Sequence, residues 1–182
     1  MLDDADFQAV IPSVLQAGFL NSGQACIAGT RILVPRSRLV EFEAVAKDGV
    51  SQILSGDPRN ADTDIGPMVS RKQWERVQHY IRIGQEEGAR LLAGGEGRPE
   101  GLHAGWFVRP TIFTDANNRM RIAREEIFGP VLAIIPYEDD AEAISIANDT
   151  DYGLSALVLG KSTERCVNIA RQIDSGRVLI NP

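Results

Sequence analysis

The sequence predicts an α/β fold with a largely parallel β-sheet. Two observations predict this class. Amphipathic helical segments alternate with short apolar strands along the 182 residues, and the composition is that of a globular protein, 43% hydrophobic and 24% charged. Such alternation is typical of parallel sheets, because a crossover between parallel strands needs a connection of helical length. A chain of this length buries roughly 70% of its unfolded surface, so a substantial core is available.

The first helix is expected over residues 7–19, where apolar residues recur at the i, i+3, i+4 spacing of a helix with one buried face. Pro12 lies inside this pattern and predicts either a kink or an irregular first turn. A short apolar run at 31–35 predicts a buried strand. The next helix is predicted over 39–50, with Ser37 as its N-terminal cap.

The middle of the chain contains two predicted loops. Residues 55–69 hold three Asp, two Gly and two Pro, a composition that favours turns over regular structure. Ser70 would cap the helix that follows, and Gly88 would end it. A strand is predicted at 89–93, and the glycine-rich segment 94–105 is the second loop.

The last third of the chain continues the alternation. Strands and helices are expected in turn, at 107–113 (strand), 131–136 (strand), 139–147 (helix), 155–159 (strand), 162–173 (helix) and 177–180 (strand). This order supports the α/β class and gives no sign of a repeat or a flexible linker.

Charge and composition argue against several functions. With 19 Lys and Arg against 25 Asp and Glu, the net charge of -6 disfavours binding to nucleic acid. The longest apolar run, residues 131–135, is too short to span a bilayer, and the first residues show no secretory signal. Two cysteines and two histidines argue against a structural zinc site. We therefore expect a cytoplasmic protein without nucleic-acid, membrane or metal partners.

A cysteine stands out in the segment FLNSGQACIAGTR, residues 19–31. Cys26 follows a predicted helix and has small neighbours, which let a substrate approach and leave backbone N–H groups accessible. A thiolate in such a place is a good nucleophile. The alternative is that Cys26 simply packs in the core, as free cysteines commonly do.

A second segment of interest is EEIFGPV, residues 125–131. If the segment is extended, Glu126 and Phe128 point to the same face. The carboxylate would then accept hydrogen bonds from a sugar diol, and the aromatic ring would lie against another ring. The alternative is a helix end followed by a turn, with exposed acids and a core phenylalanine.

Taken together and in this order, the two segments resemble the two signatures of the aldehyde dehydrogenase superfamily. Further matches to the family run along the chain, at LDDAD (2–6), GDP (56–58), IGPMVS (65–70), EGARLLAGG (87–95), VRPTIF (108–113) and ANDTDYGLSA (147–156). The resemblance implies a three-layer αβα domain of the aldehyde dehydrogenase catalytic-domain type.

Members of the family are more than twice as long as this chain. The resemblance therefore implies that residues 1–182 are a partial catalytic domain, with the cofactor-binding and oligomerisation parts absent. The full-length parent would be a homo-oligomer. The resemblance implies little or no aldehyde oxidation by the isolated chain, because the family's general base and one oxyanion donor would lie in the missing part.

The resemblance also assigns roles to three residues. Cys26 matches the nucleophile, which would form a thiohemiacetal with a small-molecule aldehyde, pass hydride to NAD or NADP, and leave a thioester for hydrolysis. Its backbone N–H would donate to the oxyanion. Glu126 and Phe128 match the residues that hold the nicotinamide ribose. Asn21 and Gln24 flank the nucleophile as candidate pocket residues, although Asn21 also suits an ordinary helix cap.

Other reactive side chains are assigned no role. Cys166 lies on the apolar face of a predicted helix, and His79 and His103 match no catalytic position. Two alternatives to a hydrolytic aldehyde dehydrogenase stay open: an acylating relative that passes the acyl group to coenzyme A, and a fragment without activity. The sequence does not identify the aldehyde or decide between NAD and NADP.

Overall fold

The computed structural model describes all 182 residues and contains two β-sheets. The main sheet has the order β1 (Arg31–Pro35), β4 (Val131–Tyr137), β3 (Thr111–Thr114), β2 (Arg90–Ala93). Its β1–β4 and β4–β3 pairs are parallel, and β2 is antiparallel to β3. The second sheet pairs β5 (Ala156–Val158) with β6 (Val178–Ile180) in parallel. The α/β class and the largely parallel pairing are confirmed, but the strands divide into two sheets.

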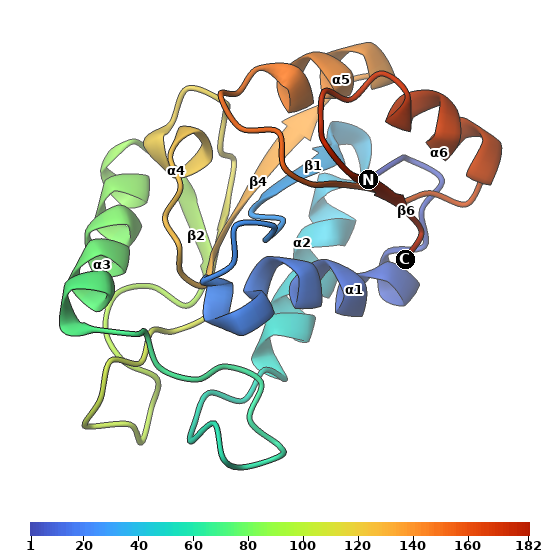
Figure 1. Ribbon diagram of the computed structural model, residues 1–182. Helices are drawn as coiled ribbons and strands as arrows, with labels where there is room; N and C mark the ends of the chain where they lie inside the picture. Colours follow the sequence, from blue (N-terminus) through green and yellow to red (C-terminus); the bar gives the residue numbers. More distant parts are fainter.

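Helices cover both faces of the main sheet, as Figure 1 shows. The α-helices are α1 (Phe7–Phe19), α2 (Leu39–Ser51), α3 (Arg71–Glu86), α4 (Arg121–Arg124), α5 (Asp140–Asn148) and α6 (Thr163–Ala170). In β4, residues 132 and 134 belong to the core under α1 and α2, whereas residues 131, 133 and 135 belong to the core under α3 and α4. This alternation, which follows from the two-residue period of a strand, produces the predicted three layers.

The helix starts test the predicted caps. The Asp6 carboxylate accepts from the N–H groups of Gln8 and Ala9, and α1 runs through Pro12 to Phe19 without ending. Ser70 caps α3 as predicted, accepting from the Gln73 N–H at 3.2 Å.

The predicted Ser37 cap is wrong. Residues Arg36–Arg38 form a 3-10 turn, and α2 begins after Arg38 with no side-chain cap. The turn supplies hydrogen bonds of its own at the entry to the helix, so a hydroxyl cap is not needed there. The side chain of Arg38 instead donates to the Asp3 and Ala5 carbonyls.

Two further differences concern the strand and helix after the second loop. The strand predicted at 107–113 is confined to Thr111–Thr114, because Pro110 has no N–H to donate to a neighbouring strand. The short helix α4 was not predicted, since four residues are too few to show a helical period.

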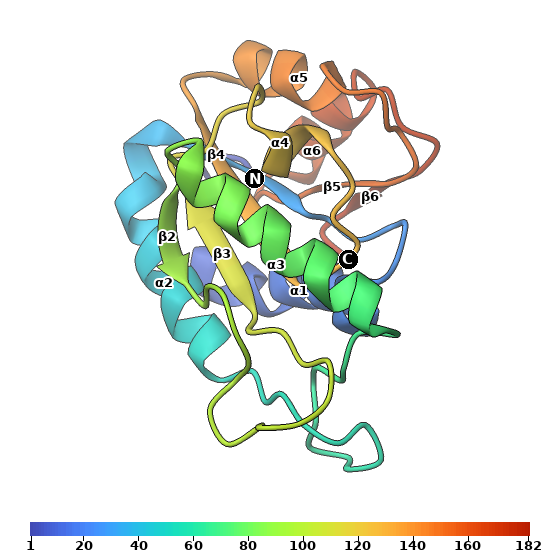
Figure 2. The same cartoon turned by 90° about the vertical axis from the view of Figure 1, so that its left-hand side faces the viewer.

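Figure 2 shows the loops 52–70 and 94–110 extending beyond the same end of the sheet. None of the helices combines the length and apolar character that crossing a bilayer requires.

Because the amino group of Met1 is buried, the free energy of unfolding should depend on pH. It donates to the Leu33 carbonyl at 2.8 Å, and burial lowers its pKa from 8.0 to about 6. Between those values the unfolded chain binds more protons than the folded chain, so the free energy of unfolding should rise as pH increases from 6 to 8, by about 1–3 kcal/mol. Urea unfolding at both pH values measures the difference. Acetylation of Met1 should remove it, and an unchanged rise in the acetylated protein would contradict the assignment.

Candidate active site

Cys26 lies in the connection between α1 and β1, in a turn closed by the Ala28 N–H and the Ala25 carbonyl at 3.0 Å. Its side chain is exposed, so the prediction of an accessible thiol fits the structure better than core packing. The N–H groups of Cys26 and Ile27 donate to no acceptor in the protein. The turn therefore presents a thiol together with unpaired backbone donors, the combination that acyl chemistry on a cysteine needs.

The backbone before the cysteine is unusual. Asn21, Ser22 and Gly23 have φ values of 51°, 60° and 72°, so three successive residues are left-handed. Only glycine adopts this conformation without a steric cost. The turn is held by two bonds between Asn21 and Gln24, from the Gln24 N–H to the Asn21 carbonyl and from the Asn21 side chain to the Gln24 carbonyl. Asn21 follows the C-cap residue of α1 in the left-handed conformation, which fits the ordinary helix cap, and its side chain is exposed.

A neighbouring segment holds the cysteine turn in place. The Ser22 hydroxyl donates to the Gly66 carbonyl at 3.2 Å, and the Gln24 side-chain oxygen accepts from the Val69 N–H at 2.9 Å. Both partners belong to IGPMVS, one of the segments that carries the family resemblance. Its role as a support for Cys26 was not predicted, because sequence alone does not show that residues more than forty positions apart are bonded.

The two signature segments meet directly behind the cysteine. A Cβ atom at Gly23 would lie 2.1 Å from the Gly129 carbonyl oxygen and 2.7 Å from the Pro130 nitrogen. Gly129 in turn packs on α3, where a Cβ would lie 2.4 Å from a methyl carbon of Val77. The glycines therefore permit a backbone contact that fixes the Cys26 turn against residues 125–130.

This contact predicts a large loss of stability in Gly23→Ala. The methyl group would clash with backbone atoms in a left-handed conformation, so we expect a loss of at least ~3 kcal/mol in the free energy of unfolding. Gly88→Ala is the matched control, because Gly88 has φ 91° but nothing within 4 Å of a Cβ. It should lose only about 1 kcal/mol, the cost of the backbone conformation alone. Urea unfolding compares the two, and equal losses would contradict the role of the contact.

The two adjacent glutamates differ in their contacts. Glu125 accepts from the Tyr80 hydroxyl at 2.5 Å and from Arg121 at 3.1 Å, and these hydrogen bonds hold its pKa below the usual range. The Glu126 carboxylate is exposed and has no hydrogen bond or ion pair in the protein. It is therefore the carboxylate of this segment that remains free to bind a ligand.

Glu126 and Phe128 were expected to point to the same face because the segment was taken to be extended. Phe128 has φ 61°, so the segment is not extended and the two-residue period of a strand does not apply. Phe128 is half-buried, and the main chain bends at Gly129 and Pro130. Whether the two side chains face one ligand is therefore a proposal that rests on the turn and on the family match.

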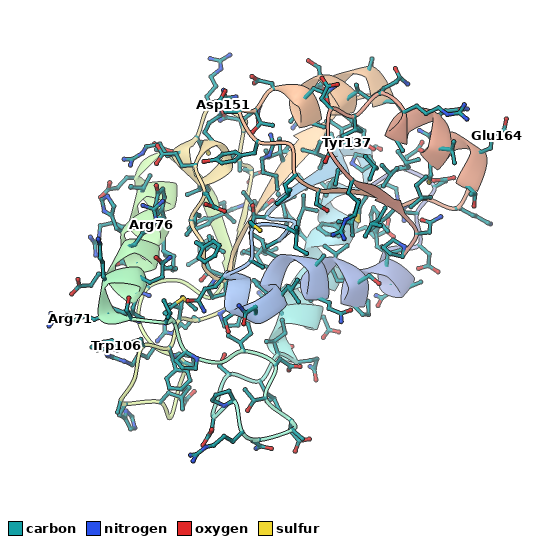
Figure 3. The ribbon with its side chains drawn as sticks, in the orientation of Figure 1. Arg71, Arg76, Trp106, Tyr137, Asp151 and Glu164 are labelled. Carbon is teal, nitrogen blue, oxygen red and sulfur yellow. The ribbon has the colours of Figure 1, made fainter.

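Helix α3 fixes the main chain of this turn. Arg76, which Figure 3 labels on α3, donates to the Glu126 carbonyl at 2.6 Å. The Gln73 amide donates to the Ile127 and Phe128 carbonyls at 3.0 and 2.8 Å. These bonds use the carbonyl groups of the segment and leave the Glu126 carboxylate free.

The second cysteine is structural, as predicted. Cys166 is the fully buried residue of α6, and burial is the main cause that raises the pKa of its thiol. His79 and His103 are exposed and lie on α3 and in the 94–105 loop, away from the Cys26 turn in sequence.

The chain thus has a three-layer αβα fold and an exposed cysteine in a turn that hydrogen bonds hold in place, as the resemblance to aldehyde dehydrogenases implies. The chain belongs to the aldehyde dehydrogenase family, whose model matches residues 1–182. It is 51% identical over 181 residues to a 3-succinoylsemialdehyde-pyridine dehydrogenase of a Pseudomonas species, and 50% identical to a putative aldehyde dehydrogenase of Staphylococcus aureus. All of this chain but only 38% of each relative is covered.

Solved structures of aldehyde dehydrogenases are similar to this chain in fold and in sequence. A mutant of aldehyde dehydrogenase C from Pseudomonas syringae, in complex with NAD+ and octanal, matches with a TM-score of 0.97 and 46% identity, over 100% of this chain and 37% of that one. An aldehyde dehydrogenase of Mycobacterium tuberculosis, in complex with NAD+, matches with a TM-score of 0.96 and 49% identity, over 99% and 37%. The chain thus spans a little over a third of the length of its relatives.

Proposed function

We propose that this chain carries the nucleophile and part of the cofactor site of an enzyme that oxidises a small-molecule aldehyde to a carboxylic acid. In this proposal, residues 1–182 are part of a catalytic domain. The observation that carries it is the exposed Cys26 thiol, in a turn with unpaired N–H groups and fixed against the Glu126 segment. Membership of the family and the octanal complex of one relative support an aldehyde as the substrate.

Cys26 would act through its thiolate. The sulfur attacks the aldehyde carbon and forms a thiohemiacetal, while the Cys26 N–H donates to the oxygen that gains charge. Oxidation of that carbon gives a thioester, and water then cleaves the carbon–sulfur bond and returns the thiol. A bound nicotinamide, NAD or NADP, supplies the acceptor for the hydride.

Glu126 and Phe128 fit a role in holding that cofactor. Both Glu126 carboxylate oxygens lack protein partners, so each is available to accept from one hydroxyl of a ribose diol. Phe128 offers a half-buried ring from the same turn. The NAD+ complexes of two solved relatives support this assignment.

The isolated chain should turn over little aldehyde. No side chain hydrogen-bonds to the Cys26 sulfur in the structure, so no general base for thiol activation or thioester hydrolysis is identified among these residues. Catalytic groups that act as a unit fail together, and the loss is far from additive.

A chimera tests the proposal. Residues 1–182 replace the matching segment of the Pseudomonas relative, and aldehyde oxidation is followed by formation of the acid and of reduced cofactor. We expect turnover in the chimera and a loss of at least ~10³-fold in its Cys26→Ala variant. Cys166→Ala is the matched control and should keep its activity. Comparable activity of the Cys26→Ala variant, or product formed only as an acyl-coenzyme A when coenzyme A is added, would contradict the proposal.

A further inference from the structure

The segment ANDTDYGLSA, residues 147–156, lies against the residues that lead into Glu126. It connects α5 to β5 and takes no part in the hydrogen bonds that hold the Cys26 turn. Figure 1 shows this connection, in orange, passing beside α4. Arg124, the last residue of α4, donates to the Asp149 carbonyl at 2.8 Å and forms an ion pair with the Asp149 carboxylate at 2.9 Å. The two segments are therefore joined two residues before Glu126.

Tyr152 of this segment contacts Glu126 directly. The Glu126 N–H donates to the Tyr152 hydroxyl oxygen at 3.3 Å. The Glu126 carbonyl accepts from Arg76 of α3 at 2.6 Å. Both main-chain polar groups of Glu126 are thus bound by side chains, and these side chains come from elements that are far apart in the sequence. Only the carboxylate of this residue is left without a partner.

The main chain around Tyr152 is anchored on both sides. Before it, the Asn118 side chain donates to the Asp149 carbonyl at 2.7 Å. After it, the Gly153 carbonyl accepts from the Gly176 N–H at 2.7 Å. A side chain on an anchored segment loses less conformational entropy when it binds than one on a free loop. Tyr152 can therefore hold a partner in a fixed place from a connection without regular structure.

The exposure of Tyr152 indicates that its bond acts on geometry. The side chain is 55% exposed, and water could replace its hydroxyl at the exposed Glu126 N–H, so the bond contributes little to the free energy of unfolding. It does select one orientation of the peptide group that precedes Glu126. Tyr80 differs in both respects, because it is buried and donates to the side chain of Glu125.

We propose that Tyr152 is a positioning residue for the Glu126 carboxylate. Its hydroxyl holds the Glu126 N–H while Arg76 holds the Glu126 carbonyl, and together they direct the carboxylate toward the ribose diol of a bound cofactor. Tyr152 acts through Glu126 and not through contact with the reacting atoms. The inference rests on the proposed function of Glu126.

The substitution Tyr152→Phe in the chimera tests the proposal, because it removes only the hydroxyl. We expect the rate of cofactor reduction at saturating cofactor to fall ~10-fold, the order of effect that one neutral hydrogen bond can produce. Tyr80→Phe is the matched control. It removes the same atom beside Glu125, and the rate should change by less than ~2-fold, because the lost bond holds no main-chain group of Glu126.

A double-mutant cycle separates positioning from a general structural effect. If Tyr152 acts through the carboxylate, adding Tyr152→Phe to Glu126→Gln should lower the rate by no more than ~2-fold further, since the group to be positioned is already lost. The same ~10-fold loss in both backgrounds would overturn the proposal, because Tyr152 would then act independently of Glu126.

Amide hydrogen exchange tests the contact without cofactor. In the 182-residue chain, NMR should show the Glu126 N–H exchanging at least ~3-fold faster in Tyr152→Phe than in the unmodified protein, and unchanged in Tyr80→Phe. Equal exchange at Glu126 in Tyr152→Phe and the unmodified protein would overturn the proposal. A chimera without turnover would contradict the proposed function instead, and exchange at Glu126 would still decide whether Tyr152 holds this residue.

Discussion

A brief exposure of the native protein to iodoacetamide is expected to alkylate Cys26 and to leave Cys166 unmodified. Cys26 lies in an exposed turn. Cys166 is fully buried, so Cys166 reacts only when α6 opens. Local opening of a packed element costs several kcal/mol, which predicts a selectivity of at least ~10³-fold. Burial also raises the pKa of the Cys166 thiol, and this lowers its thiolate fraction further.

Mass spectrometry of tryptic peptides measures the two adducts over time. The Cys26→Ser variant is the control and should lose nearly all labelling of the native protein. Labelling of both cysteines in urea shows that each is chemically competent once the chain unfolds. Preferential modification of Cys166 in the native state would exclude Cys26 as the reactive thiol.

Most of the fold could be predicted from sequence, because most helices and strands carry a clear period. The α1 helix shows the i, i+3, i+4 pattern, and Ser70 precedes α3 as a cap. The incorrect predictions occur where a residue type favours one local structure and the main chain adopts another. Serine is a common N-cap residue, but Ser37 lies within a 3-10 turn. The division into two sheets was not visible, since no local pattern shows which strands are neighbours.

The sequence singles out the residues of the candidate site, but it does not show how the fold brings their segments together. Cys26 and Glu126 were found as separate segments, and the structure joins them through the contact of Gly23 with Gly129. That contact depends on three left-handed residues, of which Asn21 and Ser22 give no sequence signal strong enough to predict them. The left-handed Phe128 shows the same limit, because an aromatic residue before Gly-Pro is compatible with an extended chain or with a turn.

The substitution Glu126→Gln in the chimera is expected to slow cofactor reduction about a hundredfold without unfolding the domain. A carboxylate accepts from both ribose hydroxyls, and charge-assisted hydrogen bonds are roughly twice as strong as neutral ones. Glutamine keeps the shape but offers one acceptor oxygen. A reacting ring displaced by ~1 Å costs about a hundredfold in rate. Because the Glu126 carboxylate has no protein partner, the free energy of unfolding should change by no more than about 0.5 kcal/mol.

Glu125→Gln is the matched control, since it makes the same chemical change one residue away. Glu125 is bonded to Tyr80 and Arg121, so its loss should lower the free energy of unfolding by about 0.5–1 kcal/mol and leave the rate of cofactor reduction unchanged. Stopped-flow absorbance measures the rate, calorimetry measures NAD binding, and urea unfolding measures stability. Hydrolysis of the thioester should be equal in the two variants, because it requires Cys26 and water. If Glu126→Gln reduces the cofactor at the rate of the unmodified chimera, Glu126 does not belong to the site. If both variants lose rate equally, the effect belongs to the turn and not to the free carboxylate.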